Sequence, residues 1–149
     1  MISRILVPVD GSNTAKRAAV YAVELARQLN ASIIVLTVIE RSKLTAETIP
    51  ASKTLMHTIE PIDDYLKEVA EKNMGEILKL CDKNNVVSEM FIKTGHPVKE
   101  ILKMAKKSAS DLIVMGSHGI SALPAAVLGS VSYGVLHNCR QCNVLIVRG

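Results

Sequence analysis

The chain has 149 residues, of which 48% are hydrophobic and 21% charged, a composition that excludes disorder and suits one domain. We therefore expect a single globular domain over residues 1–149. Lys and Arg outnumber Asp and Glu by 18 to 14, but the basic residues are scattered and only three Tyr and one Phe could stack on bases, which argues against nucleic-acid binding.

Hydrophobic blocks are too short for a membrane protein. Charged residues such as Arg41, Asp63 and Lys79 interrupt them, and none approaches the roughly 20 residues of a bilayer span. The first apolar stretch ends at Asp10, too early for the core of a signal peptide. We expect a cytoplasmic protein that does not contact membranes.

The first third of the chain predicts strand, helix and strand. Residues 4–10 form a β-branched run typical of a buried strand, and Gly11-Ser12 marks a turn. Ser12 is then a suitable N-cap for a helix with a small apolar face. That face recurs at helical spacing through Ala15, Ala18, Ala19, Ala22, Ala26 and Leu29. Residues 32–40 predict the second buried strand.

The middle of the chain begins with an insert. Residues 41–59 lack a clear period and contain Pro50, which favours a loop or a short helix. Apolar residues at helical spacing then predict a long helix that begins near Pro61 and continues through Cys81. Residues 87–93 predict the third strand.

The last third predicts two more helices and two more strands. A helix begins at Pro97, residues 111–116 form the fourth strand, residues 129–139 the last helix, and residues 144–148 the fifth strand. Apolar strands separated by helices indicate an α/β fold: a five-stranded parallel, Rossmann-like sheet with helices on both faces. Such sheets bind ligands at the carboxyl ends of their strands, where Asp10 and Gly116 lie.

One glycine constellation suggests chemistry. Gly116-Ser117-His118-Gly119 follows the fourth strand, and Gly129-Ser130 opens the last helix after nine further residues. Glycines after a strand permit positive φ and close approach of backbone N–H groups to an anion, and the helix N-terminus carries a partial positive charge. These features predict a phosphate cradle; the alternative is a loop whose glycines only turn the chain.

At this point the chain resembles a family. VPVDGS, TVIE, DLIVMGSHG, LGSVS and NVLIVR, together with the nine-residue spacer, are similar to the universal stress proteins of the ATP-binding branch, over essentially all 149 residues. The resemblance implies the five-stranded parallel fold and ATP as the ligand, with AMP or ADP as alternatives. It also implies a homodimer formed by antiparallel pairing of the last strand.

The resemblance further assigns the ligand contacts. It places adenine against Pro8, Val9 and Asp10, with the Val38 backbone reading its edge and Met115 in the apolar wall. Asp10 has an alternative role, namely capping the turn at Gly11-Ser12. The ribose and phosphates are assigned to Gly116, Ser117, His118 and Gly119, and the distal phosphates to Gly129, Ser130, Val131 and Ser132.

The spacer departs from the family pattern, in which a basic residue is common. Residues 120–128 carry no positive charge, while a helix N-terminus offers only about +0.5 charge against a triphosphate. We therefore expect Mg²⁺ or Mn²⁺ at the phosphates, or help from Arg41 or Lys43 of the insert.

The histidines and cysteines suggest no further site. Among the four histidines only His118 lies near the glycines, where it faces either a phosphate or solvent. Cys139-x-x-Cys142 follows the C-terminal end of a helix, where the dipole disfavours a thiolate, and with His137 it offers only three zinc ligands. We favour packing over redox chemistry or metal binding, and we expect reduced thiols.

The function that we infer is an ATP-binding universal stress protein, a nucleotide-dependent regulatory module in stress response. One alternative is a slow ATP-hydrolysing enzyme, for which only Ser130 and His118 are nearby candidates and no catalytic residue can be assigned. The other is a dimerising interaction protein without nucleotide binding.

Overall fold

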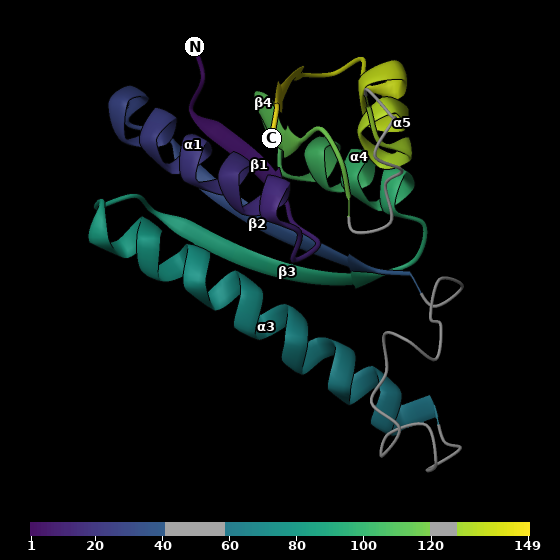
Figure 1. Cartoon of the computed structure of the whole chain (residues 1–149). Coiled ribbons are helices and arrows are strands. Elements are labelled where there is room, and N and C mark those ends of the chain that lie inside the picture. Colours follow the sequence, from purple (N-terminus) through teal and green to yellow (C-terminus); the bar gives the residue numbers. More distant parts are fainter. Residues whose placement is uncertain (41–58, 120–127) are drawn as a thin grey trace.

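The structure is a computed structural model that describes residues 1–40, 59–119 and 128–149. Its five strands form one parallel sheet in the order β3-β2-β1-β4-β5 (Figure 1). The elements are β1 (Arg4–Pro8), α1 (Asn13–Leu29), β2 (Ser32–Ile39), α3 (Ile59–Lys83), β3 (Ser88–Thr94), α4 (Pro97–Lys107), β4 (Leu112–Gly116), α5 (Ser130–Asn138) and β5 (Asn143–Val147). The predicted α/β fold is confirmed.

Helices cover both faces of the sheet, as predicted. The alanine face of α1 and the Met74 side of α3 pack against Ile5, Val7 and the neighbouring strand residues that point the same way. On the opposite face, α4 and Val135 of α5 cover a second cluster that includes Leu6. Because side chains alternate along a strand, each central strand contributes to both clusters.

The structure shifts several predicted boundaries. β1 ends at Pro8 rather than Asp10, and α3 begins at Ile59 rather than Pro61. β3 runs one residue later than expected, and α5 spans Ser130–Asn138 rather than residues 129–139. Residues 41–58, which hold most of the predicted insert, lie outside the described part of the chain.

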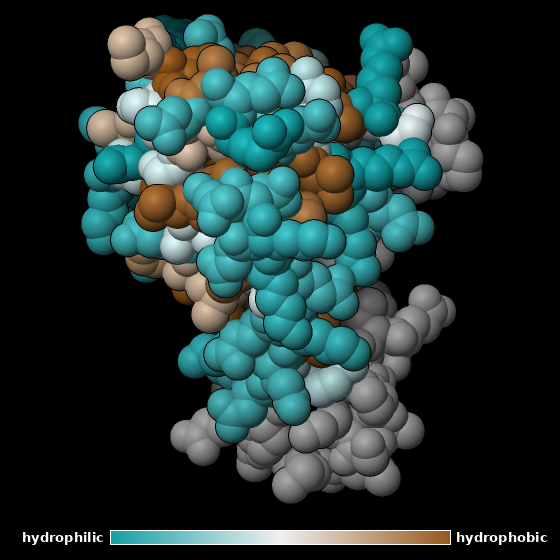
Figure 2. Space-filling model, turned by 90° about the vertical axis from the view of Figure 1, so that its left-hand side faces the viewer, coloured by the Kyte–Doolittle hydropathy of each residue, from teal (hydrophilic) through white to brown (hydrophobic). Residues whose placement is uncertain are grey.

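The two outermost strands are not buried on both faces. β3 leaves Met90 and Phe91 exposed, and β5 is only half-buried. β3 and β5 are the edge strands of the sheet and are therefore less buried than β1 and β4 between them. Figure 2 shows hydrophobic residues gathered in the upper half of one side of the molecule and hydrophilic residues dominating the lower half, which α3 occupies.

The order of the strands sets where a ligand site can form. The chain moves outward from β1 through β2 to β3, then crosses to β4 on the other side of β1 and ends at β5. The winding direction therefore reverses between β1 and β4. In open α/β sheets the crevice at that reversal, beside the carboxyl ends of the strands, is the usual ligand site.

Candidate functional site

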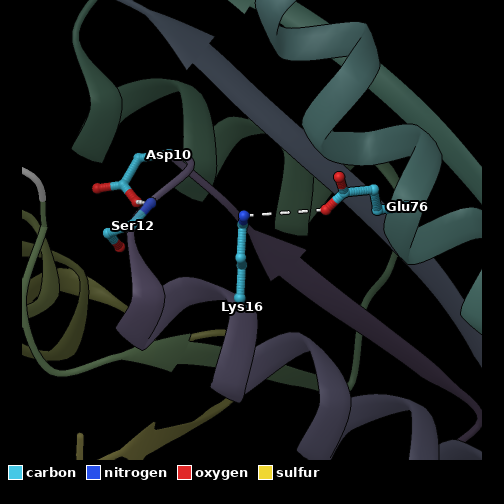
Figure 3. Close-up of polar contacts among 4 residues, drawn as sticks. All are labelled: Asp10, Ser12, Lys16 and Glu76. Atoms are coloured by element: carbon cyan, nitrogen blue, oxygen red, sulfur yellow. Dashed lines mark hydrogen bonds and ion pairs between the residues drawn. The ribbon is translucent and has the colours of Figure 1, made fainter.

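The turn after β1 is held by side-chain hydrogen bonds. Asp10 Oδ1 accepts from the Ser12 backbone N–H at 2.9 Å (Figure 3). Ser12 Oγ accepts from the Ala15 N–H at 3.2 Å. Gly11 has a φ of +84°, which favours glycine. Ser12 is thus the N-cap of α1, as predicted, and Asp10 caps the turn, as the alternative interpretation proposed.

The segment after β4 packs against the start of α1. A Cβ on Gly116 would lie 2.8 Å from the Thr14 carbonyl carbon and 3.0 Å from the Ala15 nitrogen, so only glycine fits this contact. Thr14 Oγ1 also donates a hydrogen bond to the His118 carbonyl oxygen. Sequence analysis missed Thr14, because its partner lies 104 residues away and no local motif marks the contact.

Two distant glycine segments meet at this end of the sheet. Gly129 N donates to the Ser117 carbonyl at 2.7 Å, and a Cβ on Gly129 would lie 3.3 Å from His118 Cα. On the other side, a Cβ on Gly119 would come within 2.9 Å of Asp10 Oδ2. The turn after β1, the segment after β4 and the start of α5 therefore converge.

The first turn of α5 presents free backbone donors toward this junction. Its first intrahelical bond runs from Tyr133 N to Gly129 O at 2.9 Å, so the amides of Ser130, Val131 and Ser132 precede the helical ladder. The Ser130 side chain is exposed. Ser132 is buried, and its hydroxyl donates to the Gly116 carbonyl at 2.7 Å, which ties α5 to the end of β4.

The residues assigned to adenine lie at the same end of the sheet but not on one face. Val9 is buried in the α1–α3 cluster, whereas Met115 is buried in the α4–α5 cluster and Val38 packs against that second cluster. The segment after β1 lies beside β2, because Val9 N donates to the Leu36 carbonyl at 2.8 Å and Thr37 Oγ1 donates to the Val9 carbonyl at 3.1 Å. Pro8 is half-buried next to them.

The glycines act through close approach and not through positive φ. Among the described glycines only Gly11 and Gly95 have positive φ, and Gly129 is extended with a φ of −69°. Positive φ, which the sequence permits at the glycines after β4, is not adopted by Gly116 or Gly119. What these two glycines and Gly129 provide is the absence of a Cβ where neighbouring segments approach closely.

Two polar pairs flank the junction. Ser117 Oγ and His118 Nδ1 lie 2.8 Å apart, with Ser117 buried and His118 half-buried. Lys16, in the first turn of α1, lies 3.8 Å from a Glu76 carboxylate oxygen of α3 (Figure 3). Lys16 is a cation that sequence analysis did not consider; Arg41 and Lys43 lie outside the described residues, as do residues 120–127 of the spacer.

The described residues contain neither a cluster of metal ligands nor a membrane-spanning helix. Over the described ranges, no three His, Cys, Asp or Glu side chains are grouped so that they could hold a metal ion by themselves. In the same ranges no helix is both long and apolar enough to span a membrane. A cation at this site would therefore need ligands that the described carboxylates and imidazoles do not supply alone.

Comparisons with known proteins place the chain in a family. Residues 1–148 match the model of the universal stress protein family. Universal stress protein YxiE of Bacillus subtilis is 34% identical over 149 residues, covering 99% of this chain and 100% of the relative. The solved structure of hypothetical protein MJ0577 superposes with a TM-score of 0.84 at 29% identity, covering 100% of this chain and 97% of that one.

A further solved structure is a universal stress protein in complex with cAMP. It has a TM-score of 0.71 and 24% identity, and covers 98% of this chain and 97% of that one, so it supports the fold. The family match extends over nearly the whole sequence and agrees with the strand order and the glycine-rich junction. This chain belongs to the universal stress protein family.

Proposed function

We propose that this chain binds ATP at the carboxyl end of its sheet and acts as a nucleotide-dependent regulatory module in stress response. The observation that carries the proposal is the convergence of three segments between β1 and β4. Gly119 lies against Asp10, and Gly129 lies against Ser117 and His118. The adenine nucleotide held by a related protein of the same fold supports the choice of ligand.

The phosphates are the part of the ligand that this junction suits best. The amides of Ser130, Val131 and Ser132 open α5, and helix N-termini attract anions through both their free N–H groups and their dipole. The exposed Ser130 hydroxyl adds one donor. Because the Ser132 hydroxyl already donates to Gly116, we assign Ser132 to the phosphates through its backbone. Gly116, Ser117, His118 and Gly119 line the path from ribose to phosphates.

Adenine then lies toward β1 and β2. Pro8, Val9 and Asp10 form the segment beside the end of β2, and the Val38 backbone supplies polar groups for the base edge. Met115 belongs to the hydrophobic core on the α4–α5 face of the sheet and contributes the apolar wall of this region. Asp10 Oδ2, the oxygen near Gly119, would then face the ribose in this proposal.

A divalent cation, Mg²⁺ or Mn²⁺, completes the site in this proposal. A helix N-terminus compensates about half an elementary charge, far less than a triphosphate carries. The local donors are hydroxyls and amides, with Asp10 as the nearby carboxylate, so phosphate oxygens and water would supply most cation ligands. The cation would neutralise phosphate charge.

Calorimetric titration with ATP, ADP and AMP, each with and without Mg²⁺, tests the proposal. We expect ATP to bind most tightly and Mg²⁺ to strengthen its binding. Purified protein should also release an adenine-absorbing compound when heated, if ligand is retained. The proposal fails if none of the three nucleotides produces binding heat and no adenine compound is released. ADP release from ATP in the same samples would indicate the slow hydrolysing enzyme instead.

We also propose that the chain forms a homodimer through β5 and works in the cytoplasm. β5 is an edge of the sheet, it is half-buried, and its apolar NVLIV sequence would leave unpaired backbone groups exposed. Antiparallel pairing with a second copy across a two-fold axis would cover them. Sedimentation that gives only a monomer at micromolar concentration would overturn the dimer.

A further inference from the structure

The turn between α5 and β5 brings two cysteine thiols together. Cys139 is the residue after α5, and Cys142 directly precedes β5. Their Sγ atoms are 3.3 Å apart, and the Cys139 thiol also donates to the Cys142 carbonyl at 3.3 Å. Both side chains are half-buried and both thiols are free. The two sulfur atoms are therefore in direct contact.

The backbone on both sides of this turn is held in place. Cys139 N donates to the Val135 carbonyl at 2.8 Å, and Asn143 N donates to the Asp111 carbonyl at 3.2 Å. Between them, Gln141 Nε2 donates to the Leu102 carbonyl at 3.1 Å. A disulfide has an S–S bond of about 2.05 Å, so the thiols need to approach by only about 1 Å. The native turn thus keeps the pair close to bonding distance.

A cavity lies beside one member of the pair, Cys142. It has a volume of about 600 Å³ and is lined by Cys142 together with Lys106, Arg140 and Asp111, among others. The third cysteine, Cys81, is in a different position, because it is fully buried between α3 and the sheet. The cavity therefore opens on Cys142, and Cys139 is half-buried beside it with its sulfur 3.3 Å away, whereas Cys81 is shielded by the core.

We propose that Cys139 and Cys142 are a reversible disulfide site that reacts with small disulfides. The Cys139 sulfur attacks one sulfur of the small disulfide, forms a mixed disulfide and releases one small thiol. The Cys142 sulfur then attacks the Cys139 sulfur and releases the second small thiol. The two thiol protons end on the two released thiols; the protein pair is oxidised and the small disulfide is reduced.

The environment of Cys142 assigns it the second step. Burial, the hydrogen bond with Cys139 and the nearby negative charges of Cys139 and Asp111 raise the pKa of Cys142 to about 12. Since only a thiolate is a good nucleophile, Cys142 is a poor first attacker at neutral pH. In the mixed disulfide it lies next to the sulfur that it must attack, and proximity compensates for its weak acidity.

The site is separate from the proposed nucleotide site. Asn143 pairs with Leu112 at the amino end of β4, whereas Gly116 at its carboxyl end pairs with Val147. The cysteine pair therefore lies at the opposite end of the sheet from the glycine junction. The dipole of α5 disfavours a thiolate at its C-terminal end, but it does not keep the two sulfur atoms apart.

Oxidised glutathione is the probe for the test. The protein is equilibrated with glutathione buffers of increasing oxidising potential, acid-quenched and alkylated, and analysed by mass spectrometry of the intact chain. We expect the number of free thiols in the chain to fall from three to one, and the chain to lose the mass of two hydrogen atoms. Dithiothreitol should reduce the disulfide and restore all three thiols. Proteolysis should locate the bond between Cys139 and Cys142.

Three variants complete the test. Cys81→Ala should form the same disulfide, whereas Cys139→Ser and Cys142→Ser should each stop at a mixed disulfide with glutathione or remain reduced. The inference is overturned if the natural protein retains three thiols in the most oxidising buffer, accumulates only mixed disulfides, or links two chains. These measurements use no nucleotide, so their failure is distinct from failure of the ATP proposal.

Discussion

The two ends of β1 and β4 are held together in different ways. At the carboxyl ends, backbone segments approach closely because glycines lack side chains, whereas at the amino ends side-chain hydrogen bonds join the two strands. Gly116 and Gly129 bring the first site together through close approach. At the other end, Asp111 accepts hydrogen bonds from the Ser3 N–H at 2.8 Å, the Ser3 hydroxyl at 2.9 Å and the Arg4 N–H at 2.9 Å.

This difference changes what a mutation tests. At the carboxyl ends, a side chain added at a glycine occupies space that the backbone or the ligand needs, so it should weaken the proposed nucleotide binding. At the side-chain end, removal of a carboxylate or a thiol changes stability or redox behaviour and leaves the glycine junction intact.

Gly129→Val should abolish ATP binding, by at least about 100-fold, because a branched side chain fills the space beside Ser117 and His118. The φ of −69° at Gly129 suits valine, so an unfavourable φ does not explain a loss. Because a Cβ there would lie 3.3 Å from backbone atoms of Ser117 and His118, thermal unfolding must show that the variant keeps its fold. Calorimetry and thermal unfolding of the same protein check this. Gly75→Ala is the matched control, since a Cβ there meets nothing within 4 Å and should leave affinity unchanged. ATP binding retained by Gly129→Val contradicts the cradle.

Ser130→Ala should weaken ATP binding by roughly 10-fold to 150-fold, the effect of losing one hydrogen bond to a charged group. Its side chain is exposed, so the free energy of unfolding should change little. Ser132→Ala is the contrast: it removes the hydrogen bond to the Gly116 carbonyl and should lower stability by about 1 kcal/mol. If Ser130→Ala loses stability and retains affinity, the assigned roles of the two serines are reversed.

Asp111→Asn should lower the free energy of unfolding by roughly 1 kcal/mol at neutral pH. Hydrogen bonds from the Ser3 N–H, the Ser3 hydroxyl and the Arg4 N–H hold the pKa of Asp111 below its ordinary value of 3.8. A lowered pKa stabilises the fold above pH about 4, and this contribution disappears as the pH falls through the folded-state pKa. Denaturant unfolding should therefore show that the free energies of unfolding of the natural protein and of Asp111→Asn differ less at pH 3 than at pH 7. The same difference at both pH values would indicate that Asp111 contributes through packing and not through its charge.

Cys139→Ser and Cys142→Ser should leave ATP affinity unchanged to within about twofold, because the pair lies at the other end of β4 and β5 and distant sites act independently. Titration of each reduced variant with ATP checks this, with the natural protein as reference. A large loss of affinity in either variant would mean that the two ends of the sheet are coupled through α5.

Local patterns in the sequence determined most of the elements. The alternation of apolar runs with helical spacing defined the strands and helices, and Ser12 marked the start of α1, because hydrogen bonding and burial within an element depend on neighbouring residues. The boundary errors at β1 and α3 were small. The family resemblance, together with the glycine spacing, also pointed to the residues that meet near the switch point.

Tertiary structure alone decided which residues of distant segments touch. The crossover from β3 to β4 places Gly119 against Asp10 and Thr14 against His118, contacts that no local period encodes. Backbone conformation at Gly129 likewise depends on its contact with Ser117. The distance between Cys139 and Cys142 depends on how α5 and β5 are anchored to the rest of the sheet, so a spacing of three residues could not distinguish two separated thiols from a pair in contact.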